Sequence, residues 1–214
     1  MADLADMRRV YATTLRIHAH KLIAFGYERM DRSLYFDWEE PSITGELVRM
    51  IREFTESDDA PDWAVYYSLG DDPPLNVSKK FGKSRPRVDI EFEKTGVRGP
   101  RPRLRFEAKR LGKSKGHTIS AYLGAEGMGC FISGKYPLTH NEAGMLGYIQ
   151  AGKEENWSDQ IEKALKEMAD KYSVASPPYN HQKICDLEHT YVSYHCLESR
   201  VAVIAIHHLL LRFF

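Results

Sequence analysis

Residues 86–94 and 102–111 alternate apolar and polar side chains with a period of two. This is the spacing of a β-strand, in which successive side chains point to opposite faces of a sheet. The connection at 95–100, with the sequence TGVRGP, contains the glycine and proline typical of a turn, so we expect the two segments to form a hairpin. Once they pair, their apolar faces share the core and their polar faces form one surface.

Other apolar patterns predict the elements around this hairpin. Helical spacing predicts helices at 3–24, 42–56, 117–126 and 157–172. Further strands are expected at 63–69, 128–134, 145–150, 189–196 and, as a buried strand with a β-branched start, 199–212. This order of helices and strands predicts an α/β domain in which helices flank a mixed central β-sheet.

Size and composition limit the alternatives. The chain has 214 residues, which favours a single domain, with its core at about 42–150 and the first helix and the last segment packed outside that core. Its 30 Lys and Arg balance its 30 Asp and Glu, so the total charge indicates no partner. Its 3 cysteines lack C-x-x-C spacing, which is typical of a reducing compartment and provides no disulfide or metal framework.

Neither export nor membrane insertion is predicted. The N-terminal segment carries charges throughout and lacks the apolar stretch of a secretory signal. The longest apolar run, from Val201 to Leu211, contains two histidines and is too short to span a bilayer. We therefore expect a cytoplasmic protein that does not enter the membrane.

Three side chains on the polar surface of the hairpin form a candidate catalytic group: Asp89, Glu107 and Lys109. Two converging carboxylates repel each other unless a cation lies between them. Hard oxygen ligands suit Mg²⁺ or Mn²⁺, which take few protein carboxylates and keep several waters. Lys109 lies on the same face as Glu107, where it can orient or deprotonate an attacking water or stabilise charge on a phosphate.

The same residues carry a family pattern. Val88-Asp89, a gap that contains a turn, and Glu107-Ala108-Lys109 at the end of a hydrophobic strand resemble the D…(D/E)-x-K signature of the PD-(D/E)xK, or restriction-endonuclease-like, nucleases. Val88 stands where the proline of the family name would be, at a position that varies in the family. The resemblance covers roughly residues 42–150, by strand order and motif rather than by continuous identity.

This resemblance implies a restriction-endonuclease-like core that hydrolyses DNA with Mg²⁺ or Mn²⁺ held by Asp89 and Glu107 and with Lys109 serving the attacking water. An earlier helix often supplies another acid in the family, and Glu46, at the edge of the apolar stripe of the 42–56 helix, is the matching candidate. Restriction and phage defence are among the implied roles, and RNA stays open as a substrate. The family also implies a homodimer, since two sites cut two strands, or a partner subunit.

Charge is segregated along the chain although it sums to zero. From Lys79 to Lys115 there are fourteen basic and four acidic residues, which leaves a net charge of +10, whereas 37–72 is strongly acidic. A basic patch around a carboxylate cluster is what a phosphate backbone requires. The residues expected to hold nucleic acid are Lys83, Arg85, Arg103, Arg105, Arg110, Lys113 and Lys115.

Simpler interpretations compete with the catalytic one. The three hairpin residues could form a salt-bridge ladder across the strands, and Glu91 competes with Asp89 on the same face. Glu46 could equally be a solvated residue at the edge of its helix. A nuclease fold that binds nucleic acid or protein without cutting it is the alternative function.

Polar residues outside the hairpin are weaker candidates. Four of them alternate on one face of the 189–196 strand, where a hydrogen-bonded, half-buried face is the favoured interpretation: His189, Tyr191, Ser193 and His195. Glu142 and Gln150 follow the E-x-K strand in the chain and are candidates for supporting the site.

Overall fold

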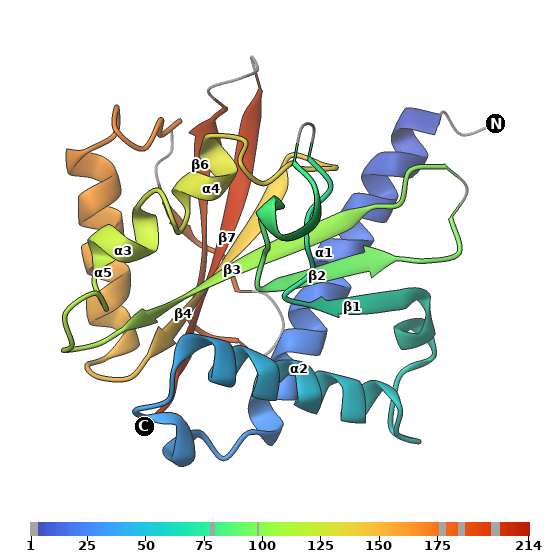
Figure 1. The fold of residues 1–214 in the computed structure, drawn as a ribbon, viewed down its shortest axis with the longest axis horizontal. Helices are drawn as coiled ribbons and strands as arrows, with labels where there is room; N and C mark the ends of the chain where they lie inside the picture. Colours follow the sequence, from blue (N-terminus) through green and yellow to red (C-terminus); the bar gives the residue numbers. More distant parts are fainter. Residues whose placement is uncertain (1–3, 78–79, 98, 176–178, 184–186, 198–201) are drawn as a thin grey trace.

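The computed structural model describes residues 4–77, 80–97, 99–175, 179–183, 187–197 and 202–214. Its centre is a seven-stranded sheet in the order β1-β2-β3-β4-β7-β6-β5 (Figure 1). The strands are β1 (Tyr67–Asp71), β2 (Ile90–Lys94), β3 (Arg103–Leu111), β4 (Glu142–Ile149), β5 (Asn180–His181), β6 (Thr190–Cys196) and β7 (Val203–Arg212). The α-helices are α1 (Leu4–Arg29), α2 (Glu40–Thr55), α3 (Ile119–Leu123), α4 (Gly129–Ile132) and α5 (Glu154–Glu167), and the 3₁₀ helices are η1 (Arg32–Tyr35), η2 (Asp62–Tyr66) and η3 (Gly82–Ser84).

The sheet is mixed, as predicted. β3, β4 and β7 are parallel neighbours at its centre, and antiparallel pairs extend it to both edges. The predicted hairpin is confirmed, because β2 pairs with β3 so that Ile90 lies opposite Phe106 and Glu91 lies opposite Arg105. β4 and β7 are buried along most of their length, which is typical of parallel strands covered on both faces.

Two hydrophobic cores lie on opposite faces of this sheet. Residues of α1 and α2 pack in one core with Phe92, Phe106 and Tyr148. Residues of α3, α4 and α5 pack in the other core with Met145 and Ile149. Side chains of a single strand alternate between the two cores because successive residues point to opposite faces. The sheet is therefore flanked by helices on both sides (Figure 1).

Two predicted strand segments are helical instead. Residues 63–66 belong to η2, and β1 begins only at Tyr67. The segment 128–134 contains α4, which follows a turn of closely packed backbone. A Cβ at Gly127 would lie 2.2 Å from the Tyr122 carbonyl oxygen, so this approach requires glycine.

The other predicted elements are present with shifted ends. α1 continues to Arg29, β4 begins at Glu142 and α5 ends at Glu167. Of the predicted strand 199–212, residues 203–212 form β7, and residues 199–201 lie outside the described residues. No helix in the described part of the chain combines the length and the apolar character needed to cross a membrane.

Close packing of β3 against β4 holds the strand that carries the candidate site. Gly144 of β4 lies opposite Phe106 of β3, and a Cβ at Gly144 would lie 2.1 Å from the Phe106 ring. A glycine inside a strand commonly marks such a close approach. Since Glu107 follows Phe106 directly, this packing determines where the first residue of the E-x-K motif lies.

Candidate active site

Asp89, Glu107 and Lys109 converge where β2 begins beside β3. Glu107 and Lys109 project from the same side of β3, and Lys109 Nζ lies 2.9 Å from Glu107 Oε1. Asp89 directly precedes β2, and its Oδ2 accepts a hydrogen bond from the Ala108 backbone N–H at 2.6 Å. The Asp89 carboxylate also interacts with both Glu107 and Lys109. The structure therefore brings together the three residues that the alternation places on one surface.

The backbone around Asp89 does not follow the regular alternation of a strand. Val88 packs in the core opposite to that of Ile90, whereas strict alternation would put both in the same core. The Asp89 carbonyl accepts a hydrogen bond from the Asp72 backbone N–H at 3.0 Å. The chain thus turns just before β2, which a local pattern of apolar and polar residues does not reveal.

A further carboxylate at this place comes from α2, and it belongs to Glu40 rather than to Glu46. Glu40 lies in the first turn of α2, and its Oε1 is 3.0 Å from Lys109 Nζ. Lys109 Nζ also lies 2.6 Å from the Ala108 carbonyl oxygen. The ammonium group is therefore enclosed by oxygen atoms of Glu40, Glu107 and Ala108.

Glu46 lies further along α2. Its carboxylate accepts hydrogen bonds from the Tyr35 hydroxyl at 3.0 Å and from Arg49 Nε at 2.8 Å, and the bond from Arg49 lowers the pKa of Glu46. Glu46 follows Glu40 by six positions, which correspond to a rise of about 9 Å along the helix. The prediction started the helix at 42, although an acid directly before Pro41 is a typical first-turn signal.

Burial and mutual repulsion shift the pKa values of the two acids, Asp89 and Glu107. Burial, and after it the charge of Asp89, raises the pKa of Glu107 to about 8. Burial raises the pKa of Asp89 as well, although the Ala108 N–H and Lys109 act in the opposite direction. Near neutral pH the two carboxyl groups therefore share a proton when Lys109 is the only cation beside them.

The same surroundings act on the pKa of Lys109 in two opposite ways. Burial acts to lower the pKa of Lys109, but the attraction of Glu107 and Glu40 outweighs it and raises this pKa. Lys109 is therefore a cation at neutral pH, held by two acids from different elements of the fold.

The oxygen atoms of the site suit a small divalent cation. Mg²⁺ takes one or two protein carboxylates and keeps several waters. Asp89 and Glu107 supply two carboxylates that repel each other without a cation. In the part of the chain that the structure describes, no group of three or more His, Cys, Asp or Glu side chains is arranged to hold a metal. A metal here would therefore be held by Asp89 and Glu107, with water completing its coordination.

Tyr136 contacts Glu107 from the segment that follows α4. Its hydroxyl hydrogen-bonds with the Glu107 carboxylate, and burial together with the charge of Glu107 raises the pKa of Tyr136. The Cys130 thiol of α4 interacts with the same hydroxyl and donates to the Ala125 carbonyl at 3.1 Å. Tyr136 was not predicted, because it lies between the predicted strands 128–134 and 145–150 and no motif links it to β3.

Two of the basic residues predicted to hold nucleic acid are paired with acids of β2. Arg105 Nε lies 2.6 Å from Glu91 Oε2, and Arg103 Nη2 lies 2.5 Å from Glu93 Oε2. The Arg105 side chain is only 8% exposed. These pairs form a cross-strand ladder, although its residues are not the three that the alternative interpretation named, Asp89, Glu107 and Lys109. Glu91 is therefore engaged by Arg105, whereas Asp89 is the acid that reaches Glu107.

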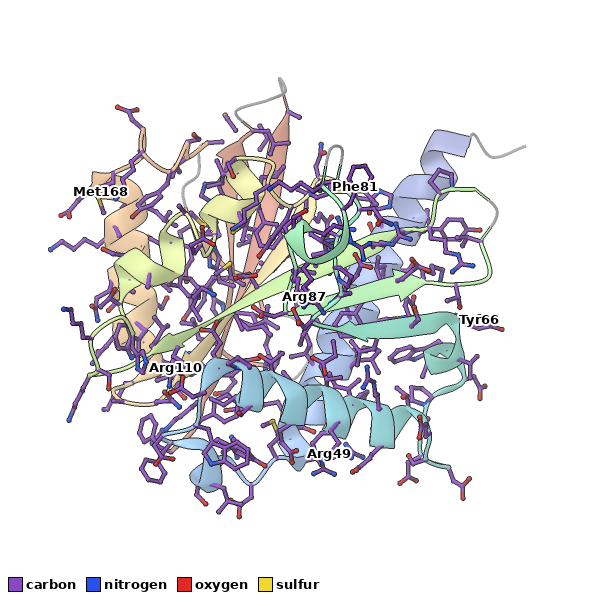
Figure 2. All side chains as sticks on the ribbon, viewed as in Figure 1. Arg49, Tyr66, Phe81, Arg87, Arg110 and Met168 are labelled. Atoms are coloured by element: carbon purple, nitrogen blue, oxygen red, sulfur yellow. The ribbon has the colours of Figure 1, made fainter. Side chains whose placement is uncertain are left out.

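Arg110, Lys113 and Lys115 lie where β3 ends and the following connection begins. Figure 2 shows Arg110 where β3 passes the start of α2, and its backbone N–H donates to Glu40 at 3.2 Å. Lys113 and Lys115 are exposed. A hollow of about 340 Å³ opens here, and its lining includes Lys109, Arg110, Lys115, Glu40 and His117. Lys109 therefore lines a hollow at the surface beside the start of α2.

Lys83 and Arg85 lie in the connection between β1 and β2. Lys83 is exposed, and Arg85 Nη1 donates to Asn76 Oδ1 at 2.8 Å. They precede Asp89 by a few residues on the same connection, so the predicted basic patch extends on both sides of the site along the chain.

The polar residues that the sequence left open have structural contacts elsewhere. Ser193 Oγ lies 2.6 Å from His195 Nε2 and 2.7 Å from His208 Nε2, and all three side chains are buried. Glu142 pairs with an arginine of α1. Gln150 donates to two backbone carbonyls of the segment before α2, which keeps that segment beside the end of β4. The favoured interpretation of Ser193 and His195, a hydrogen-bonded strand face, agrees with this network.

Comparisons with known proteins found no match, so the interpretation of the site rests on the contacts described above. No family model matches the sequence, no curated protein matches it, and no solved structure matches the fold.

Proposed function

We propose that the protein is a Mg²⁺- or Mn²⁺-dependent nuclease of the PD-(D/E)xK type that hydrolyses phosphodiester bonds in DNA. The convergence of Asp89, Glu107, Lys109 and Glu40 where β2, β3 and α2 meet carries the proposal. A mixed sheet flanked by helices is compatible with a restriction-endonuclease-like core. The few, unpatterned cysteines support a cytoplasmic location.

Each residue of the site has a defined part in this reaction. Asp89 and Glu107 would hold the metal, which when bound supplies Lewis acidity that activates water and stabilises the departing oxygen. Lys109 is held as a cation, so it would orient the water and neutralise charge on the attacked phosphate rather than act as a base. Glu40 and Tyr136 keep Lys109 and Glu107 in position.

The basic residues beyond Lys109 would hold the flanking strand. Arg110, Lys113 and Lys115 are close to the hollow that reaches Lys109, so they would contact phosphates next to the attacked one. Such contacts position the backbone without reading sequence. We therefore expect binding that weakens steeply as salt concentration rises.

A cleavage assay tests the proposal. Purified protein is incubated with supercoiled plasmid, linear duplex, single-stranded DNA and RNA, each with and without Mg²⁺ or Mn²⁺. We expect metal-dependent cleavage of DNA, and Lys109→Ala should slow it at least roughly a hundredfold, as removal of one charge-stabilising donor commonly does. Absence of cleavage with every nucleic acid and both metals would overturn the catalytic proposal.

A matched pair of variants on α2 refines the test. Glu40→Gln should slow cleavage because Lys109 loses a partner, whereas Glu46→Gln should leave the rate unchanged because the hydrogen bonds of Glu46 go to Tyr35 and Arg49. The reverse result would show that Glu46, and not Glu40, is the acid that α2 supplies to the site.

A nuclease fold that binds nucleic acid or protein without cutting is the second candidate. It is favoured by the position of Lys109, whose ammonium already contacts Glu40 and Glu107 without a metal. Mn²⁺ binding separates the two functions. A catalytic site should bind Mn²⁺, and Asp89→Asn should weaken that binding, whereas a module that only binds would show no Mn²⁺ affinity that depends on Asp89.

A further inference from the structure

The connection between β1 and β2 presents one aromatic side chain to solvent among basic residues. Phe81 is 83% exposed, more than any other large hydrophobic side chain in the described part of the chain. From Pro73 to Val88 the sequence contains five Lys or Arg and no acid. A single exposed apolar side chain is ordinary on a protein surface, so the meaning of Phe81 depends on how the chain holds it.

The connection has an anchored stem. The Leu75 N–H donates to the Pro86 carbonyl at 2.8 Å, and Pro74 and Arg87 form an antiparallel bridge. Leu75 and Val88 are both buried in the core that also contains α3, α4 and α5. The stem is therefore part of the packed structure, and it holds both ends of the segment that contains Phe81.

The turn from Phe81 to Ser84 is closed by its own hydrogen bonds. The Ser84 N–H donates to the Phe81 carbonyl at 3.1 Å, and the Phe81 N–H donates to Ser84 Oγ at 3.1 Å. Gly82 has a φ of +54°, a conformation that glycine adopts without strain. The turn therefore holds the Phe81 backbone in place while its side chain stays exposed, and Figure 2 labels Phe81 on this connection.

The charges beside the ring are available to a ligand. Within the described residues, neither Lys80 nor Lys83 is paired with a carboxylate, in contrast to Arg87, which pairs with Asp72 at 2.6 Å. An aromatic ring flanked by unpaired lysines is the combination with which proteins hold unpaired nucleotides, because bases stack on the ring and phosphates attract the cations. A lipid surface would require more apolar area than one phenylalanine provides.

The site of the proposed chemistry lies on the same connection. Asp89 follows Phe81 by eight residues, so the two are at most roughly 28 Å apart, a length that about eight stacked nucleotides span. A strand held at the tip can therefore continue to the carboxylates.

We propose that the β1–β2 connection binds a single-stranded or locally opened segment of the nucleic acid, with the Phe81 ring stacked on an unpaired base and with Lys80 and Lys83 on the adjacent phosphates. This inference rests on the proposed function, because the strand held at Phe81 is the one that continues to Asp89. It names the substrate class as nucleic acid with an accessible base face rather than a continuous duplex.

Binding without cleavage tests the inference. Fluorescence anisotropy in EDTA measures the affinity of wild-type protein and Phe81→Ala for a labelled oligothymidylate, for an abasic strand of the same length and for a duplex. We expect Phe81→Ala to weaken oligothymidylate binding roughly tenfold, as loss of one stacked base does, and to leave abasic-strand and duplex binding unchanged. Lys83→Ala should weaken binding of both single strands and reduce its salt dependence.

Tyr66→Ala is the matched control. Tyr66 is also exposed, at 54%, and Figure 2 shows it at the edge of the molecule beside β1, far from the tip of the connection. This variant should bind every strand as wild type does. Equal affinity of wild type and Phe81→Ala for oligothymidylate would overturn the inference, and so would a Phe81-dependent affinity for anionic phospholipid vesicles with none for oligonucleotides.

The same data separate this inference from the catalytic proposal. Phe81-dependent binding in EDTA with no cleavage in any metal would support the inference and leave the protein a binding module. Metal-dependent cleavage, together with an affinity that is the same for wild type and Phe81→Ala, would support the nuclease proposal and overturn the inference.

Discussion

Glu107 is a residue at which burial and a neighbouring negative charge shift the pKa in the same direction. Its pKa is raised to about 8 in the folded protein, first by burial and then by Asp89, whereas an unfolded glutamate titrates near its ordinary value. The folded state therefore holds the proton over a pH range in which the unfolded state has lost it. The free energy of unfolding contributed by this group falls as the pH rises from about 4.5 to about 8.

Glu107→Gln tests this balance in metal-free protein. We expect the variant to gain stability relative to wild type as the pH rises, by at most about 1.4 kcal/mol per pH unit between 4.5 and 8. Urea unfolding at several pH values in EDTA measures the difference, and Glu162→Gln, on the solvated face of α5, is a control that should track wild type. A constant difference between Glu107→Gln and wild type across this range would contradict the assigned pKa.

At the scale of elements, the contact between β3 and β4 is the tightest support of the site. A Cβ at Gly144 would lie 2.1 Å from the Phe106 ring, and the ring is fully buried against α1, α2 and β2 residues. Gly144→Ala should therefore displace the ring or the strand and lower the free energy of unfolding by about 1–3 kcal/mol, the usual cost of overpacking a core. Thermal unfolding followed by circular dichroism measures the loss.

Gly45→Ala is the matched control for that change. Gly45 lies within α2, and a Cβ there would have no atom within 4 Å. The substitution should raise stability by roughly 0.5–1 kcal/mol because alanine is the better helix former. Phe106→Leu should restore part of the stability lost in Gly144→Ala, and a double variant no more stable than Gly144→Ala would show that the ring is not the obstacle.

Elements also show why the sequence predicted the hairpin but not the whole site. The alternation that places Glu107 and Lys109 on one face is local, and β3 reproduces it. The contact between Glu40 and Lys109 joins residues that are far apart in the chain, so no spacing rule reveals it. The face of Val88 was misassigned for a related reason, because the turn before β2 depends on hydrogen bonds to the end of β1.

At the scale of the whole molecule, the mixed sheet and its flanking helices followed from the order of patterned segments. One error lies between β3 and β4, where the short helix α4 and glycine turns replace the predicted strand 128–134. In such segments backbone packing decides the conformation, as at Gly127, and periodicity carries little information. Tyr136 comes from this part of the chain, which is why the contact that supports Glu107 went unpredicted.

The whole molecule also contains three histidines that folding keeps neutral. Burial lowers the pKa of His20 to about 3, that of His195 to about 4, and that of His208 well below its ordinary value. The unfolded chain binds protons at these residues near pH 6.5 and the folded chain does not, so the free energy of unfolding falls as the pH drops from about 6.5 toward 4. Glu107 and Asp89, whose pKa values burial raises, act in the opposite direction, so the net loss is smaller than the three histidines alone would give.

The expected result is cooperative acid unfolding. Three such histidines minus one glutamate correspond to a loss of at most roughly 3 kcal/mol per pH unit, or about 5 kcal/mol between pH 6.5 and 4.5, which is comparable to the lower end of a typical domain stability of about 5–15 kcal/mol. His20→Phe, which suits a place beside the Phe106 and His207 rings, should move the acid midpoint to lower pH. His181→Ala, at an exposed position outside the buried cores, should leave the midpoint unchanged. Circular dichroism during acid titration measures both, and a wild-type melting temperature that stays constant from pH 7 to pH 4 would show that these histidines take up protons without unfolding.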